Sequence, residues 1–525
     1  MTIIIGASNS PGMEAYAIME QQRMGIIDIG SNSIRLAIYE RTPEGAYRVI
    51  DGSKQAGRLS EQIDGEGKLN EAAVDRLVGT LHRFRLLCFH HRTERIRAVA
   101  TAAIRNAANC GDVLDRLAKE TGMTVELLSG KEEAAYGFLG MLNTMDVQDG
   151  FLIDIGGGST ELSLFRSREL IRSVSFPFGA VNTSKRYADK GTLDDKSLAE
   201  FESVLRKAIE AEPWIREAAG LPLVGIGGTV RTLAKMHQAQ IKYPLRQTHN
   251  YGMRPEDTEA LFASLQELSL EKRKKTPGLS KDRADLIVPG IAILRTFFRA
   301  CRADRYLICG AGLRDGLFFD SVLPSGGRLD DPLGYSIANI GALYPDAPQP
   351  HIEQVNRVAS ALYEALAPHY PIGGQAAACL RVASRLFRIG AGIDYYQYAK
   401  HTFYLMVNSH LNGISHRGIL ISAAVASYKN RSGARQLHQT YKPIMADDDL
   451  ETVYRLGTLL QLAVALDRSE SQPFTGLAAD IRSNKLVLRP IGQNGPLTME
   501  RSEVEALADD FKKVWGLTPV LESTS

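Results

Sequence analysis

Residues 26–39 read Ile-Ile-Asp-Ile-Gly-Ser-Asn-Ser-Ile-Arg-Leu-Ala-Ile-Tyr, and residues 152–165 read Leu-Ile-Asp-Ile-Gly-Gly-Gly-Ser-Thr-Glu-Leu-Ser-Leu-Phe. Aligned on Asp28 and Asp154, the copies share the acidic residue, the glycine that follows two positions later and a serine at the end of the turn. Each copy combines an apolar strand, a turn of small residues and a second apolar strand, which predicts a β-hairpin. Two hairpins with exposed turn amides suggest two lobes that hold one phosphate chain from both sides.

The bulk composition is that of an ordinary globular protein with more than one domain. The chain has 525 residues, of which 44% are hydrophobic and 23% charged, and two to four domains are expected at this length. The formal net charge is +2, from 62 basic and 60 acidic residues, so a polyanionic ligand would need basic residues concentrated locally. We expect no DNA partner.

Five widely spaced cysteines without a CxxC pair are typical of a reducing compartment, so we expect a cytoplasmic protein. No run of about 18 apolar residues occurs, and we expect no membrane partner. Residues 1–23 do not resemble a secretory signal and are expected to form a tail, with Met24 as a possible functional start.

Alternation of strand and helix patterns predicts an α/β layer architecture that begins again at the second hairpin. Turn-rich residues near 324–332 mark a boundary, helical periodicity follows over 351–470, and the last fifty residues alternate again. The expected domains are a tail (1–23), lobe I (24–145), lobe II (146–325), an all-α domain (330–472) and a small α+β domain (473–525).

The two turns are candidate phosphate cradles. Small residues let backbone amides approach an anion, and hydroxyl groups can donate as well. One such turn alone would fit an ordinary hairpin, and the repeat favours the anion site. Gly156-Gly157-Gly158-Ser159 is the stronger candidate, because three successive glycines are costly unless the backbone must be approached closely. In the first turn the candidates are Ser31, Asn32 and Ser33.

Asp28 and Asp154 stand beside these turns, where a bare carboxylate would repel phosphate. A Mg²⁺ ion between them would remove this conflict, so both acids are candidate metal ligands, with turn capping as the alternative. Gly228 and Thr229 open a predicted helix after a strand, which is a generic anion site or a structural turn. Arg105 is a further candidate phosphate ligand. The chain has no GxxxxGK[ST] motif and is not a Walker NTPase.

Together these segments resemble the actin, sugar-kinase and Hsp70 superfamily, and within it the exopolyphosphatase / guanosine-pentaphosphate phosphatase (Ppx/GppA) family. The resemblance covers about residues 24–320 and implies two actin-like, ribonuclease-H-like lobes. The stretches that carry it are Asp28 to Ser33, Ser129-Gly130-Lys131-Glu132-Glu133-Ala134, Asp154 to Glu161, Gly225 to Thr229 and Gly312-Leu313-Arg314-Asp315-Gly316.

The resemblance implies roles for individual residues. Glu133 matches the catalytic carboxylate that orients or deprotonates the attacking water, and Glu161 matches a second acid tied to activity. Asp154 matches the Mg²⁺-associated acid, and Asp28 is its equivalent in the first hairpin. Residues at phosphate-contacting positions are Ser31, Asn32, Ser33, Arg105, Gly157, Gly158 and Ser159.

The implied reaction is Mg²⁺-dependent release of orthophosphate from the end of inorganic polyphosphate. Three alternatives stay open: hydrolysis of guanosine pentaphosphate, a non-catalytic sensor of polyphosphate or alarmones, and a sugar or acid kinase. The Ser-Gly-Lys-Glu-Glu-Ala segment, which looks suited to water activation, disfavours the kinase. A homodimer is expected from the resemblance.

The C-terminal half resembles the helical HD-like domain of long family members. An HD phosphohydrolase needs an adjacent His-Asp pair for its metal, whereas the corresponding positions here are Phe387-Arg388, and no His-Asp dipeptide occurs in the chain. We therefore expect a non-catalytic module that extends the substrate channel or forms a dimer interface. Arg388 and Lys400 could then contact polyphosphate, and His401, His410 and His416 are expected to be core or groove residues.

Overall fold

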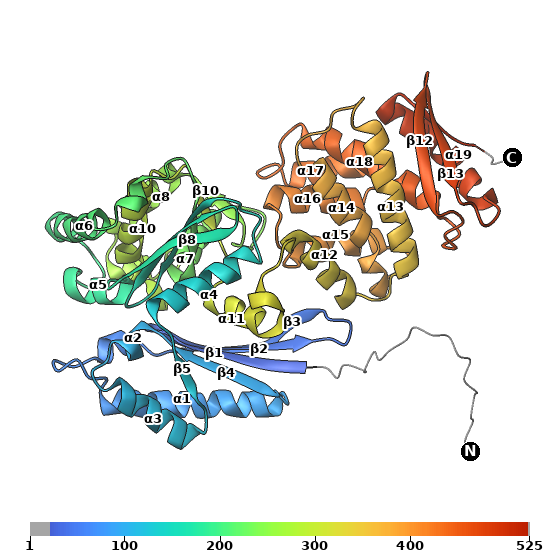
Figure 1. Ribbon diagram of the computed structural model, residues 1–525. Helices are drawn as coiled ribbons and strands as arrows, with labels where there is room; N and C mark the ends of the chain where they lie inside the picture. Colours follow the sequence, from blue (N-terminus) through green and yellow to red (C-terminus); the bar gives the residue numbers. More distant parts are fainter. Residues whose placement is uncertain (1–21, 523–525) are drawn as a thin grey trace, which may run out of the picture.

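The duplicated hairpin forms the central part of two β-sheets in the computed structural model, which describes residues 22–522 (Figure 1). The first sheet has the order β3-β2-β1-β4-β5 and the second the order β10-β11-β9-β6-β7-β8. In the first sheet the strands are β1 (Gln22–Ile29), β2 (Ser33–Arg41), β3 (Tyr47–Ala56), β4 (Arg95–Ala100) and β5 (Val125–Leu127). In the second they are β6 (Gly150–Ile155), β7 (Thr160–Arg166), β8 (Glu169–Phe176), β9 (Leu223–Ile226), β10 (Tyr251–Met253) and β11 (Tyr306–Ile308).

The two sheets repeat one pattern of pairing. In the first, β1 pairs antiparallel with β2 and parallel with β4; in the second, β6 pairs antiparallel with β7 and parallel with β9. The register places Asp28 opposite Arg35 and Asp154 opposite Glu161. Arg35 and Glu161 therefore occupy equivalent positions in the two hairpins and carry opposite charges.

Helices cover the sheets through apolar faces. In lobe I, α1 (Glu71–His90) begins at Asn70, whose side chain accepts from the Ala73 amide, and packs with α3 (Cys110–Thr121) on the sheet. Lobe I also contains the short helix α2 (Ala102–Arg105). In lobe II the covering helices are α5 (Ala180–Tyr187), α6 (Asp195–Glu210), α7 (Gly227–Gln240), α8 (Pro255–Gln266), α9 (Leu270–Arg273) and α10 (Ile287–Cys301).

Two helices cross between the lobes. Helix α4 (Gly130–Leu142) precedes the second hairpin, yet its Phe138 and Met141 pack on the second sheet. Helix α11 (Leu313–Val322) follows the second sheet, yet its Phe318 lies in a cluster with residues of β1 and β2. A division of the chain at 145/146 therefore separates α4 from the sheet that it covers.

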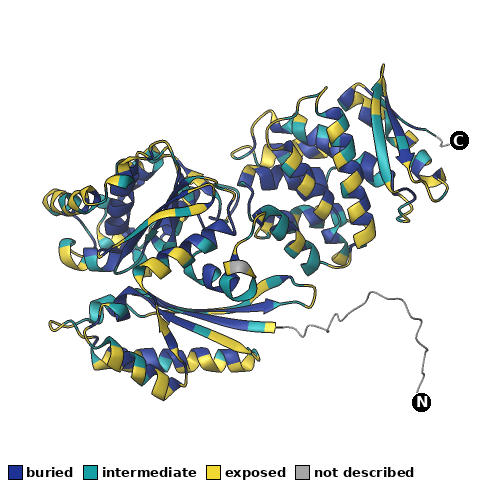
Figure 2. Cartoon of the chain, viewed as in Figure 1, coloured by how far each residue is buried: buried dark blue, intermediate teal, exposed yellow. Residues whose placement is uncertain are grey.

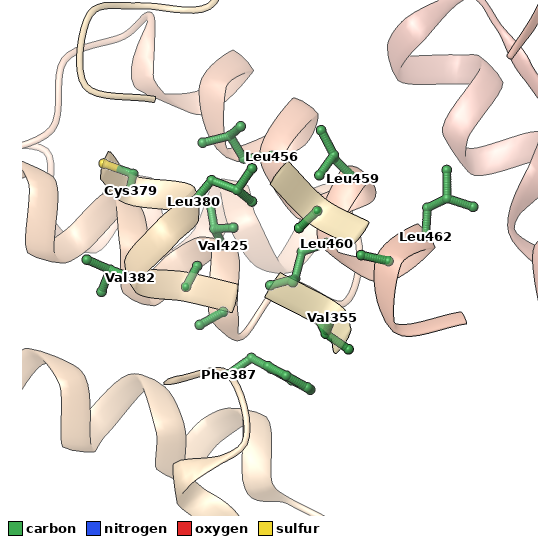
Figure 3. Packing of buried hydrophobic residues seen from close by; sticks show 14 of the residues in the cluster. Val355, Cys379, Leu380, Val382, Phe387, Val425, Leu456, Leu459, Leu460 and Leu462 are labelled. Carbon is green, nitrogen blue, oxygen red and sulfur yellow. The ribbon is translucent and has the colours of Figure 1, made fainter. Parts of the chain in front are cut away.

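A helical domain follows the lobes, and its core continues into the small C-terminal domain (Figures 1 and 2). Figure 3 shows part of this core, in which Val355, Leu380 and Leu460 are buried. The helices are α12 (Pro332–Leu343), α13 (Gln349–Leu366), α14 (Ala376–Leu386), α15 (Tyr398–Asn408), α16 (His416–Ala426), α17 (Arg431–Thr440) and α18 (Asp449–Ala465). The small domain contains β12 (Gly476–Arg482), β13 (Lys485–Ile491), α19 (Thr498–Trp515) and β14 (Thr518–Leu521). Five 3₁₀ helices complete the elements: Leu59–Gln62, Pro213–Arg216, Lys281–Arg283, Ser325–Gly327 and Ile389–Gly392.

Two buried histidines connect lobe II to the helical domain. The ring of His416 accepts from the Tyr243 hydroxyl at Nδ1 (3.0 Å) and donates from Nε2 to the His249 carbonyl oxygen (2.8 Å). The His249 ring accepts from the Gly310 amide and donates to the Thr144 carbonyl oxygen. His416 is thus an interface residue, and burial lowers the pKa of His249 to about 4.

The expected tail falls partly outside the structure. Residues 1–21 are not among those that the structure describes, whereas Gln22 and Arg23 already belong to β1, and Arg23 forms an ion pair with Glu40. Within residues 22–522, no helix is long and apolar enough to cross a membrane.

Candidate active site

The turns of both hairpins line one cleft between the lobes, with a volume of about 130 Å³. The first hairpin contributes Ser31, Asn32 and Ser33, and the second contributes Gly157 and Ser159. Gly228 and Thr229 lie in the same wall, together with Asp28, Asp154 and Glu133. The fold therefore gathers most of the residues that sequence reasoning selected, although they span two hundred positions of the chain.

The two turns approach each other so closely that a side chain would not fit between them. A Cβ atom on Gly157 would lie 2.9 Å from the Ser31 Cβ and 3.1 Å from the Asn32 amide nitrogen. Gly227 has a φ of +87°, and a Cβ atom there would lie 2.5 Å from the Asp154 Oδ1. Glycine at these two positions thus lets main chain from both lobes reach the cleft.

The adjacent acids of α4 have different surroundings. Glu132 closes a capping box: its carboxylate accepts from the Ser129 amide at 2.8 Å, and the Ser129 hydroxyl accepts from the Glu132 amide. These hydrogen bonds hold the pKa of Glu132 below its usual range. Glu133 turns into the cleft instead, where burial and the nearby Glu161 and Asp154 raise its pKa well above the ordinary value.

Arg105 lies behind Glu133 and outside the lining of the cleft. It donates from Nη1 to Glu133 Oε2 at 3.1 Å and to the Leu128 carbonyl oxygen at 2.7 Å. The sequence assigned Arg105 to phosphate, whereas in this structure its partner is the candidate catalytic acid. The guanidinium lowers the pKa of Glu133, against the larger effect of burial.

Glu161 and Gly158 also lie just outside the lining. The Ser175 hydroxyl donates to Glu161 Oε1 at 2.8 Å, while Oε2 is buried without a hydrogen-bond partner among the described residues. Burial and the nearby Asp154 raise the pKa of Glu161 to about 7. A Cβ atom on Gly158 would lie 3.0 Å from the Ser31 hydroxyl oxygen, so this glycine serves the contact between the turns.

Residues 18–325 match the family model described as the Ppx/GppA phosphatase family. The chain belongs to this family. Residues 346–489 match a second model, described as Ppx/GppA phosphatase, domain III.

Similar proteins cover the two lobes. A protein of Mycobacterium tuberculosis named exopolyphosphatase 1 is 30% identical over 310 residues, which is 56% of this chain and 87% of that protein. Its Mycobacterium leprae counterpart is 29% identical over 299 residues, 56% of this chain and 88% of its own length. An Aquifex aeolicus family member of known structure shares 26% identity at a TM-score of 0.50, over 58% of this chain and 98% of that one. A Cytophaga hutchinsonii structure described as an exopolyphosphatase shares the fold, with a TM-score of 0.54 and 24% identity over 59% and 100% of the two chains.

The Ppx/GppA cleft of this chain also contains four arginines that sequence reasoning missed. They come from four separate segments, and all line the cleft: Arg35, Arg231, Arg283 and Arg314. Burial and the neighbouring Arg35 and Arg314 lower the pKa of Arg231 to about 10. The lining also contains four acids, Asp28, Glu133, Asp154 and Asp315, so the cleft presents charges of both signs. Its arginines are the groups that can pair with phosphate oxygens.

The acids of the cleft suit a hard cation. Burial, against the opposing effect of Arg231 and with a smaller contribution from Asp28, raises the pKa of Asp154 to about 6. Oε2 of Glu161 is likewise buried without a hydrogen-bond partner among the described residues, so a bound cation would stabilise the ionised forms of both acids. No cluster of three or more acidic, histidine or cysteine side chains at metal-binding distance occurs within residues 22–522. A Mg²⁺ ion, which usually keeps several waters and substrate oxygens, needs only one or two of these carboxylates.

In the helical domain, the positions of the HD metal pair carry no metal ligands. Phe387 is buried, and Arg388 forms an ion pair with Glu470. Lys400 is exposed, so nothing in its surroundings favours a polyphosphate contact. His401 is half-buried and His410 exposed.

Proposed function

We propose that this protein is a Mg²⁺-dependent exopolyphosphatase, which hydrolyses the terminal phosphate of inorganic polyphosphate and releases orthophosphate. Membership of a phosphatase family and relatives named exopolyphosphatase 1 support a phosphoanhydride hydrolase. The observation that carries the choice of substrate is the lining of the cleft.

That lining is polar, with arginines beside carboxylates, and it has no aromatic side chain among the residues described. Four arginines, several glycine amides and the serine hydroxyls face the space. A nucleotide base usually gains affinity by stacking on a ring or by burial against apolar groups. Polyphosphate has only phosphate groups and needs no ring to stack on, and the apolar side chains of this lining are all aliphatic. This favours polyphosphate over guanosine pentaphosphate.

The residues divide the work of phosphoryl transfer, which needs positioning and charge neutralisation above all. Amides of the two turns and the arginines would bind the last phosphates. A water molecule would attack the terminal phosphorus, the bond to the bridging oxygen would break, and the departing chain would keep that oxygen's electron pair. The raised pKa of Glu133 suits this carboxylate to take the proton of the water.

Asp154 and Asp28 would hold the Mg²⁺ ion, and the buried Glu161 beside Asp154 would support that site. When bound, the ion supplies positive charge to phosphate oxygens. Glu133, Arg105 and the turn amides retain their positions without it, so their roles can be tested separately.

The deciding experiment compares long-chain polyphosphate and guanosine pentaphosphate side by side, with and without EDTA. We expect a higher kcat/KM for polyphosphate and loss of orthophosphate release in EDTA. A preference for guanosine pentaphosphate would reverse the substrate assignment, and binding of either compound without turnover would establish a sensor. ADP formation that requires a second substrate would establish a kinase.

We also propose a cytoplasmic homodimer. All five cysteines are free, which fits a reducing compartment. Light scattering of the purified chain would establish the oligomeric state.

A further inference from the structure

A second cavity lies in the helical domain, between α13, α15, α18 and the terminal helix α19, and its volume is about 380 Å³. Its chemistry differs from that of the catalytic cleft. Its apolar lining includes Val425, Leu460 and Val464 from α16 and α18. The rest of the lining consists mainly of tyrosines, cations and two acids, of which Glu470 pairs with Arg388 and Glu503 with Arg468. Cavities of this size and mixed character are typical of small-molecule sites, which span about 300–1,000 Å³.

A buried histidine in the wall of this cavity has one ring nitrogen without a hydrogen-bond partner. His351 is 1% exposed, and its Nδ1 donates to Asp467 Oδ2 at 2.7 Å. The carboxylate of Asp467 also accepts from the Gln472 amide at 2.8 Å, which fixes the pair. Nε2 of His351 has no hydrogen-bond partner among the described residues. His351 is one of the residues that line the cavity, whereas Asp467 is not. A buried polar atom without a partner is costly and is usually satisfied by a ligand or water.

Cationic side chains and tyrosine rings lie close together in the lining of this second cavity. Arg388 forms an ion pair with Glu470, and its guanidinium lies 5.7 Å from the ring centroid of Tyr395 and 6.0 Å from that of Tyr398. Tyr396 is 88% exposed, and an exposed aromatic side chain of this size is available for stacking. Lys429 lines the same space, is exposed, and forms no side-chain hydrogen bond or ion pair with any described residue.

We propose that this cavity binds a nucleotide, with its ring against the tyrosines and the apolar side chains and its phosphate near Lys429. Polyphosphate fits less well, since it has no apolar part to contact these side chains. Phe387 helps to close the inner wall, at the edge of the buried cluster that contains Val355 (Figure 3). The site is separate from the catalytic cleft. This proposal therefore does not depend on the function proposed for that cleft.

Nucleoside monophosphates test the proposal, because they have no phosphoanhydride bond that the cleft could hydrolyse. Isothermal titration of the full chain with AMP and GMP should show binding, and inorganic phosphate and tripolyphosphate should not compete for this site. Lys429→Glu and Tyr396→Ala change exposed side chains, and each should weaken binding at least about tenfold while polyphosphate hydrolysis stays unchanged. Lys442→Glu, on an exposed lysine outside the cavity, is the matched control and should bind as the parent does.

Three outcomes would overturn the proposal. The first is the absence of monophosphate binding at millimolar concentration. The second is binding that Lys429→Glu and Tyr396→Ala leave intact but Arg283→Gln in the catalytic cleft abolishes. The third is displacement of AMP by tripolyphosphate in the Arg283→Gln variant, because the ring would then contribute nothing.

Discussion

Arg105 and Glu133 form an ion pair of 3.1 Å at the edge of the catalytic cleft, and the same Arg105 nitrogen also donates to the Leu128 carbonyl oxygen. The Leu128 carbonyl oxygen therefore holds the Arg105 guanidinium in place beside the carboxylate. Side chains of both residues are mostly buried, at 19% and 13% exposure, so solvent weakens their interaction little. The pair sets the direction in which the Glu133 carboxylate points.

Glu133→Gln should fold normally and lose at least about 10²-fold in kcat, because a positioned carboxylate base contributes about 10²–10⁴-fold. Orthophosphate release from polyphosphate measures this. Glu132→Gln is the matched control, since glutamine can still complete the capping box at Ser129. Near-parental turnover by Glu133→Gln would remove Glu133 from the mechanism.

Arg105→Gln should shift the acid limb of the pH–rate profile of kcat/KM to higher pH. The arginine lowers the pKa of Glu133, so its removal raises the pH at which this carboxylate can accept a proton. If Arg105 only bound phosphate, Arg105→Gln would raise KM and leave the pH–rate profile unchanged. That result would contradict the positioning role assigned to Arg105.

Glu161→Gln should raise the Tm of the metal-free protein at pH 8. In the folded state the pKa of Glu161 is raised to about 7 from 4.5. Its contribution to stability is thus fully present below pH 4.5 and is lost as the pH rises through 7. The variant avoids this loss, so its advantage should vanish near pH 4.5 and shrink when Mg²⁺ is added. Scanning calorimetry in EDTA across this range is the measurement; a Tm that falls equally at both ends would refute the prediction.

Gly157→Ala should lower kcat/KM by about tenfold or more, because its methyl group would press on Ser31 and the Asn32 amide and displace one turn from the other. Gly111→Ala makes the same chemical change where nothing lies within 4 Å of the new carbon, and it should leave activity unchanged. Equal activity of both variants would show that the cleft tolerates a wider separation of the turns.

Sequence reasoning found those parts of the site that lie within one motif. The hairpins, their turns and Glu133 each have a local pattern, and the structure brings them into one cleft. The four arginines were missed, since each stands alone in its segment and only tertiary folding gathers them. A signal existed for Arg35, which lies in the first hairpin segment, and for Arg231 and Arg314, which lie beside or inside the glycine segments.

The fold class was predicted from strand and helix alternation and is confirmed. Helix α10 was not predicted, because residues around its whole circumference are buried and the amphipathic period is lost. The basic run at 272–275 has the composition of a solvated helix end, whereas Arg273 is 0% exposed and donates to the Gly191 and Ala284 carbonyl oxygens. In both cases the sequence pattern misleads because the residues are buried, and a single sequence does not show burial.

Seven glycines line the cleft: Gly30, Gly156, Gly157, Gly227, Gly228, Gly310 and Gly312. A main-chain amide is the same chemical group in every residue that has one. Substitutions therefore change the chemistry of these main-chain surfaces little. Diversification of substrate choice is confined to the few side chains that remain, above all the arginines. A mutant library intended to redirect this enzyme toward other anhydrides should therefore randomise the arginines and leave the glycines untouched.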